Sequence, residues 1–160
     1  MCRNYLQDRS CGQCYSSNSE AYPRILVGAG TVLTLEHVET AVDAGASFVV
    51  TPGFDSKIVD WCLSKRIPVI PGVMTPTDIN AAISRNLNVL KFFPSEAAGG
   101  ISTLKAISGP YGDIKFVPTG GITVSNLEDY LSLPMVLACG GSWLVKKALI
   151  SSGEFDTIKS

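Results

Sequence analysis

Short apolar runs alternate with amphipathic stretches from residue 25 onward. The runs are hydrophobic at nearly every position, which indicates strands buried on both faces, as in a parallel sheet. We expect these strands at 25–31, 48–53, 69–73, 89–94, 114–121 and 136–142. The stretches between them have the spacing of helices with one apolar face. We expect these helices at 35–44, 55–65, 76–86, 99–108 and 125–132.

The repeated order of strand and helix predicts parallel strands with right-handed connections. Each run ends in small residues, Thr, Pro or Gly, and these ends meet at one edge of a parallel sheet. TIM barrels keep their active sites at this edge, but a closed barrel needs eight strands. We therefore predict an α/β fold, an incomplete TIM (β/α)8 barrel of about six βα units that correspond to strands three to eight.

The first 24 residues do not follow this pattern. They are polar, rich in Cys and Ser, and have neither the strand nor the helix period, so we predict an irregular segment at 1–24 and a partial barrel at 25–160. Cys11 and Cys14 form a C-x-x-C motif, but no second Cys or His pair completes a zinc site, and His37 is the one histidine of the sequence. The motif therefore does not favour a metal or redox centre.

Composition narrows the function classes. The chain has 160 residues, of which 46% are hydrophobic and 17% charged, and a net charge of −1. These values are typical of one soluble domain and give no electrostatic reason to expect a nucleic-acid partner. No apolar run approaches the roughly 18 residues that cross a bilayer, and the N-terminus lacks a signal-peptide core, so we expect no membrane association and a cytoplasmic location.

Lys91 interrupts the apolar run 89–94. Lysine is rarely buried, and desolvation favours its neutral amine, which can attack a carbonyl and form a Schiff base. The alternative is a lysine at a strand edge whose ammonium group reaches water. The sequence Phe92-Phe93-Pro94 that follows favours the catalytic interpretation.

Two Gly-Gly pairs follow the last two predicted strands, in "PTGG" (118–121) and "CGGS" (139–142). The corresponding loops of TIM barrels often bind phosphate through backbone N–H groups. A Gly-Gly pair can also be no more than a tight turn. Because the two pairs end neighbouring strands, we favour a phosphate site, with hydroxyl groups from Thr31, Thr119 and Ser142 at the same edge.

Six motifs, taken in order, resemble the class I KDPG/KHG aldolases, which act on 2-keto-3-deoxy-6-phosphogluconate and 4-hydroxy-2-oxoglutarate. The motifs are "VGAGTV", "TPG", "IPGVMTP", "KFFPSEAAGG", "GPYGDIKFVPTGGI" and "CGGSWLV". The resemblance runs from residue 25 to about residue 158 without a gap. It implies a homotrimeric (β/α)8 barrel that uses no metal or other cofactor. It also implies cleavage of a keto acid or sugar-phosphate substrate into pyruvate and glyceraldehyde 3-phosphate or glyoxylate.

The resemblance assigns roles to nine residues of this chain. It makes Lys91 the Schiff-base lysine. The residues it implies for the pyruvate pocket are Thr31, Pro52, Phe93 and Thr119, and those for the phosphate group are Gly120, Gly121, Gly141 and Ser142.

One expected motif has no counterpart. The family's general base is a glutamate in an "E-[VI]-T-[LF]-R-T" strand, and neither this glutamate nor the arginine after it is present. We therefore expect impaired activity. The loss leaves two alternatives open: a non-catalytic remnant that binds sugar phosphates or assembles with intact subunits, and a phosphate-binding barrel with isomerase chemistry.

Our hypothesis for the missing motif is a change of reading frame near residue 20. Residues 2–8 can be encoded so that the frame one base later reads "AEITFRT", which resembles the family motif. We predict that sequencing the coding DNA will find these codons. Codons that do not spell the motif in the shifted frame would rule out this explanation.

Overall fold

The computed structural model describes residues 26–143 and consists of parallel strands and intervening helices. The strands are β1 (Gly28–Gly30), β2 (Phe48–Val50), β3 (Val69–Ile70), β4 (Gly72–Val73), β5 (Val89–Phe92) and β6 (Lys115–Pro118). The helices are α2 (Leu35–Asp43), α3 (Ser56–Ser64), α4 (Pro76–Ile83), α5 (Gly100–Ser108) and α6 (Val124–Leu131).

The strands pair in chain order, as β1-β2-β3 and as β4-β5-β6, and every pair is parallel. β3 and β4 belong to one apolar run that is interrupted at Pro71. Proline has no N–H to donate to a neighbouring strand. Its carbonyl still accepts the N–H of Lys91 at 2.9 Å, so strand contacts continue from β3 and β4 onto β5.

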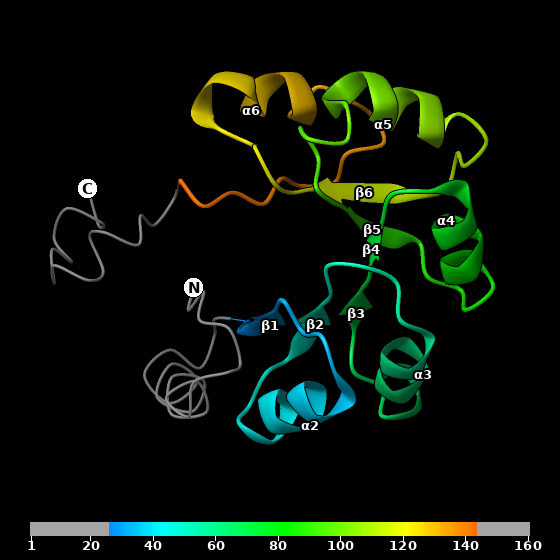
Figure 1. The fold of residues 1–160 in the computed structure, drawn as a ribbon, viewed down its shortest axis with the longest axis vertical. Helices are drawn as coiled ribbons and strands as arrows, with labels where there is room; N and C mark the ends of the chain where they lie inside the picture. Colours follow the sequence, from blue (N-terminus) through cyan, green and yellow to red (C-terminus); the bar gives the residue numbers. More distant parts are fainter. Residues whose placement is uncertain (1–25, 144–160) are drawn as a thin grey trace, which may run out of the picture.

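Helices α2 to α6 lie on the outer side of a curved layer of strands (Figure 1). The buried side chains form two apolar clusters, one beneath α2 and α3 around Val49, the other around Phe92 and Phe116. Phe54 and Leu87 pack against both clusters and join them. The core thus lies between strands and helices, and the loops at the carboxyl ends of the strands are left to form a site.

Side-chain caps begin several of these helices. Thr75 and Asp78 form a reciprocal capping box at α4, and Asn126 Oδ1 accepts the N–H of Thr123 at 2.8 Å before α6. Asp55 accepts the N–H groups of Lys57 and Ile58 at the start of α3. These bonds satisfy N–H groups that have no partner inside the helix, which explains why the helices begin where they do.

The parallel α/β arrangement expected from the sequence is confirmed, and each described helix lies within the expected range or one residue outside it. The run 136–142 differs from expectation. It forms only isolated parallel bridges, from Val136 to Phe116 and from Gly140 to Thr119, within the part of the chain that the structure describes. Two successive glycines in this run weaken its tendency to form a regular strand.

Gly72 allows the loop after β2 to cross β4 closely. A Cβ atom at Gly72 would lie 2.1 Å from the carbonyl oxygen of Pro52. The buried Thr51 hydroxyl holds this crossing, since it donates to the Gly53 carbonyl at 2.7 Å and accepts the Gly72 N–H at 3.4 Å. Any side chain at this position must displace backbone atoms.

We predict that Gly72→Ala destabilises the fold by about 1–3 kcal/mol, the usual cost of overpacking. Gly30→Ala is the matched control, because a Cβ atom at that strand glycine meets no atom within 4 Å. Urea unfolding of both variants measures the difference. Equal unfolding free energies for the two variants would contradict the steric account.

Candidate active site

Lys91 lies in the middle of β5 and is 8% exposed. Its neighbours Leu90 and Phe92 are fully buried. Its register partners are Gly72 on β4 and Val117 on β6, so paired strands hold its backbone on both sides. The Lys91 Nζ atom lies 4.4 Å from the centre of the Phe93 ring, within the range of a cation–π contact for its protonated form. The structure therefore buries the lysine side chain rather than leaving it at an open strand edge.

Phe93 also contacts the first glycine turn. A Cβ atom at Gly120 would lie 3.1 Å from the Phe93 ring, and the N–H of Thr119 donates to the Phe92 carbonyl at 3.0 Å. The side chain of Thr119 has a buried hydroxyl oxygen, with no hydrogen-bond partner among the described residues. Lys91, Phe93, Thr119 and Gly120 therefore gather at the carboxyl ends of β5 and β6.

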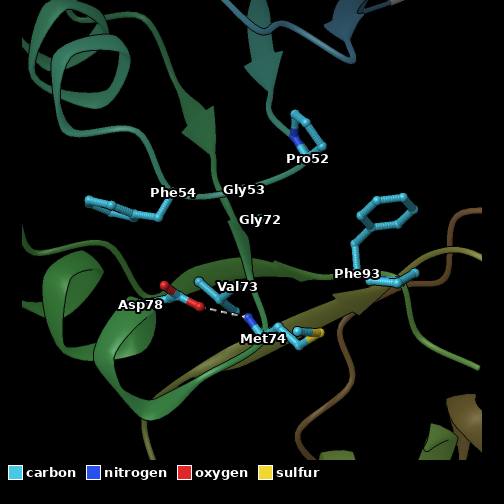
Figure 2. A pocket seen from close by; sticks show the side chains of 9 residues that line it. Pro52, Gly53, Phe54, Gly72, Val73, Met74, Asp78 and Phe93 are labelled. Carbon is cyan, nitrogen blue, oxygen red and sulfur yellow. Dashed lines mark hydrogen bonds between the residues drawn. The ribbon is translucent and has the colours of Figure 1, made fainter. Parts of the chain in front are cut away.

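A pocket of about 290 Å³ opens at the same edge. Figure 2 shows Pro52 and Phe93 on one side of the Gly72–Val73 backbone and Phe54 and Asp78 on the other. Its lining residues are Pro52, Gly53, Phe54, Gly72, Val73, Met74, Asp78, Phe93 and Pro94. Its volume is near the lower end of the range for small-molecule sites, which suits a compact ligand.

A second pocket, of about 360 Å³, lies at the opposite ends of the strands. Its residues lie in 83–88 and 110–114, which precede β5 and β6. None of the nine residues selected from the sequence lines it. Ligands of parallel α/β folds bind at the carboxyl ends of strands, so the larger pocket is not the candidate site.

The remaining selected residues occupy loops after their strands. Thr31 follows β1, is exposed, and has a φ angle of 61°, a conformation that residues with a side chain rarely adopt. Gly141 lies against the Trp143 ring, and Ser142 is exposed. These three residues lie in loops at the carboxyl ends of the strands.

The Gly120–Gly121 turn has both carbonyl groups directed to protein donors. The Gly120 carbonyl accepts the N–H of Glu96 at 3.0 Å, and the Gly121 carbonyl accepts the side-chain amide of Asn126 at 3.2 Å. Both glycines have positive φ angles, 90° and 85°. Among residues 26–143, neither the Gly120 N–H nor the Gly121 N–H donates a hydrogen bond to another residue. Such a turn can present N–H groups to an anion.

Two groups of residues at this edge were not predicted from the sequence. Met74 and Asp78 line the pocket, where the Asp78 carboxylate accepts the Met74 N–H at 3.0 Å. Ser95, Glu96 and Tyr130 form a hydrogen-bonded chain behind the glycine turn. Met74 lies in the motif "IPGVMTP", and Ser95 and Glu96 lie in "KFFPSEAAGG". Nothing in either motif indicated a functional role for these three residues.

Burial raises the pKa of Tyr130 to about 12, and its hydrogen bond to Glu96 acts in the same direction. The side chain is fully buried. Burial likewise raises the pKa of the Cys62 thiol to about 11, which makes Cys62 an unreactive core residue.

The raised pKa of Tyr130 predicts a loss of stability at high pH. In the unfolded chain the phenol ionises near pH 10, whereas in the folded chain it keeps its proton to about pH 12. The stabilisation is complete below about pH 10 and decreases above it. We expect the stability difference between wild type and Tyr130→Phe, measured by urea unfolding, to shrink from about pH 9 to about pH 11. A difference that stays constant would contradict the shift.

The residues that the structure describes contain no cluster of three or more His, Cys, Asp or Glu side chains that could hold a metal ion. They also contain no helix long and apolar enough to span a membrane.

Comparison with known proteins gives one consistent family. A family profile described as KDPG and KHG aldolase matches residues 12–160. The chain is 48% identical over 136 residues to a 2-dehydro-3-deoxy-phosphogluconate aldolase of Haemophilus influenzae, with 85% of this chain and 64% of that protein covered. It is 41% identical over 136 residues to the KHG/KDPG aldolase of Escherichia coli K12, with the same coverage. The chain thus spans less than two thirds of the length of these relatives.

A solved structure agrees. The KDPG aldolase of Legionella pneumophila, with pyruvate captured at low pH as a covalent carbinolamine intermediate, superposes with a TM-score of 0.91 and 38% identity, covering 96% of this chain and 74% of that one. The profile begins at residue 12, and the boundary near residue 24 stays a prediction. Since the profile matches most of its length, the chain belongs to the KDPG and KHG aldolase family.

Proposed function

We propose that this chain is a class I aldolase in which Lys91 forms a Schiff base with a 2-keto acid. One observation carries the proposal: Lys91 is buried in β5 and its amine lies against Phe93, a residue that lines the pocket and contacts the glycine turn at the carboxyl edge of the sheet. The covalent pyruvate intermediate of the Legionella relative supports the same chemistry.

The reaction follows from imine chemistry. The neutral Lys91 amine adds to the C2 carbonyl of the substrate, and the carbinolamine takes up a proton from solvent and loses water to give a protonated imine. This imine accepts the electron pair of the C3–C4 bond as the bond breaks. The C4 hydroxyl group gives its proton to solvent and becomes the aldehyde product, and the other product is a neutral enamine. Protonation of the enamine at C3 and hydrolysis of the imine release pyruvate and restore the lysine.

The other selected residues have binding roles in this proposal. Thr31, Pro52, Phe93 and Thr119 enclose the pyruvate portion. Two observations support this assignment. One pocket is lined by both Pro52 and Phe93, and the hydroxyl oxygen of Thr119 is buried.

The substrate phosphate binds at the glycine-rich turns after the last two strands. Gly120, Gly121, Gly141 and Ser142 supply N–H and hydroxyl groups to it. Both carbonyl groups of the Gly120–Gly121 turn accept hydrogen bonds from the protein, whereas its N–H groups donate none to the described residues. This arrangement supports the role, because the N–H groups can donate to an anion.

The substrates we propose are those of the relatives' names, 2-keto-3-deoxy-6-phosphogluconate and 4-hydroxy-2-oxoglutarate. We further propose a homotrimer that requires no cofactor, as the family resemblance implies. The fold proposed for it is the partial (β/α)8 barrel expected from the sequence.

Catalysis by this chain is expected to be weak. The "E-[VI]-T-[LF]-R-T" motif that carries the family's general base is missing from the sequence. General acid–base catalysis contributes about 10²–10⁴-fold, so turnover should fall by a factor in this range while imine formation persists.

The test is reductive trapping. We predict that borohydride in the presence of pyruvate leaves one covalent adduct, located on Lys91 by peptide mass spectrometry. Lys91→Arg should abolish the adduct, because a guanidinium group stays protonated and does not form the imine. Lys57→Arg is the matched control, since Lys57 is an exposed helix residue and its loss should leave trapping unchanged.

Folded wild-type protein without an adduct would refute the Schiff-base assignment. An adduct without cleavage of either substrate would support the alternative of a binding remnant that has lost its base.

A further inference from the structure

A hydrogen-bonded chain of three side chains lies directly behind the Gly120–Gly121 turn. Ser95 Oγ donates to Tyr130 Oη at 3.0 Å, and Tyr130 Oη donates to Glu96 Oε1 at 2.5 Å. Ser95 and Tyr130 are fully buried. Tyr130 lies on α6, whereas Ser95 and Glu96 lie in the loop between β5 and α5, so the chain ties the two segments that flank the turn.

The same two loop residues hold the turn through their backbone. The N–H of Ser95 donates to the Thr119 carbonyl at 2.8 Å, and that of Glu96 donates to the Gly120 carbonyl at 3.0 Å. The stem of Glu96 occupies the space beside Gly121, where an added Cβ atom would lie 2.5 Å from Glu96 Cβ. A displacement of Glu96 must therefore move the turn.

We propose that Tyr130 and Glu96 are positioning residues that set the glycine turn for binding the phosphate group of the substrate. This inference rests on the proposed phosphate role of Gly120 and Gly121. Neither side chain touches the ligand in this account; they act through the backbone of the turn.

The charge of Glu96 does not explain its place at this edge. The side chain is exposed, and a carboxylate near a phosphate site opposes the binding of an anion. Its useful property is the oxygen that accepts the Tyr130 hydroxyl. A glutamine keeps a side-chain oxygen acceptor and removes the charge, so Glu96→Gln separates the two effects.

The experiment measures two quantities on the full chain: the dissociation constant of inorganic phosphate, by calorimetry, and the yield of pyruvate trapped on Lys91 by borohydride. Tyr130→Phe and Glu96→Ala break the chain of hydrogen bonds, and we expect each to weaken phosphate binding about tenfold. Glu96→Gln should bind phosphate at least as tightly as wild type. Pyruvate trapping should be unchanged in all three.

Tyr111→Phe is the matched control, since Tyr111 also uses its hydroxyl to join two segments, through Asn80 at 3.1 Å, and lines the pocket at the opposite ends of the strands. It should leave phosphate binding unchanged. Thermal unfolding of each variant accompanies the binding measurements.

Three results would overturn the inference: phosphate binding by Tyr130→Phe equal to wild type, equal weakening by Glu96→Gln and Glu96→Ala, or a parallel loss of phosphate binding and pyruvate trapping. Wild-type protein that binds no phosphate would overturn it as well. If wild type traps no pyruvate while Tyr130→Phe selectively weakens phosphate binding, the Schiff-base proposal fails and the positioning role stands.

Discussion

Burial of one amine within a parallel sheet is the constraint on which the site depends. Lys91 is held between β4 and β6, and its neighbours along β5 are fully buried. Gly72, the partner of Lys91 on β4, has no side chain. The same absence of a side chain lets the loop that carries Pro52 cross β4. One glycine thus pairs with Lys91 in the sheet and allows the close crossing that forms part of the pocket wall.

Local sequence patterns predicted most of the fold for physical reasons. Continuous apolar runs are typical of doubly buried strands, and the spacing of apolar residues between them located the helices. The interruption at Pro71 and the weak pairing of 136–142 were not predicted. Whether such a segment pairs regularly depends on hydrogen bonds with neighbouring strands, which its own residues do not determine.

The candidate site was predicted unevenly. Lys91 and the glycine turns stood out because their residue types are unusual where they occur, a charge in an apolar run and paired glycines at strand ends. Tyr130 gave no such signal, because its partner Glu96 is 34 residues away and a buried tyrosine on a helix is ordinary packing. The Asp78 side chain accepts the N–H of Thr75 at the start of α4 and also lines the pocket, and its place in the sequence did not indicate the second role. The roles of Tyr130 and Asp78 depend on contacts between segments that are far apart in the sequence, so neither residue's own neighbours indicate them.

The central claim is that Lys91 reacts with a keto acid at the carboxyl edge of the sheet. A crystal structure of the protein soaked in pyruvate tests it most directly. The account predicts continuous density between Lys91 Nζ and C2 of pyruvate, with the ligand against Phe93. Pyruvate bound elsewhere, with Lys91 unmodified, would contradict it.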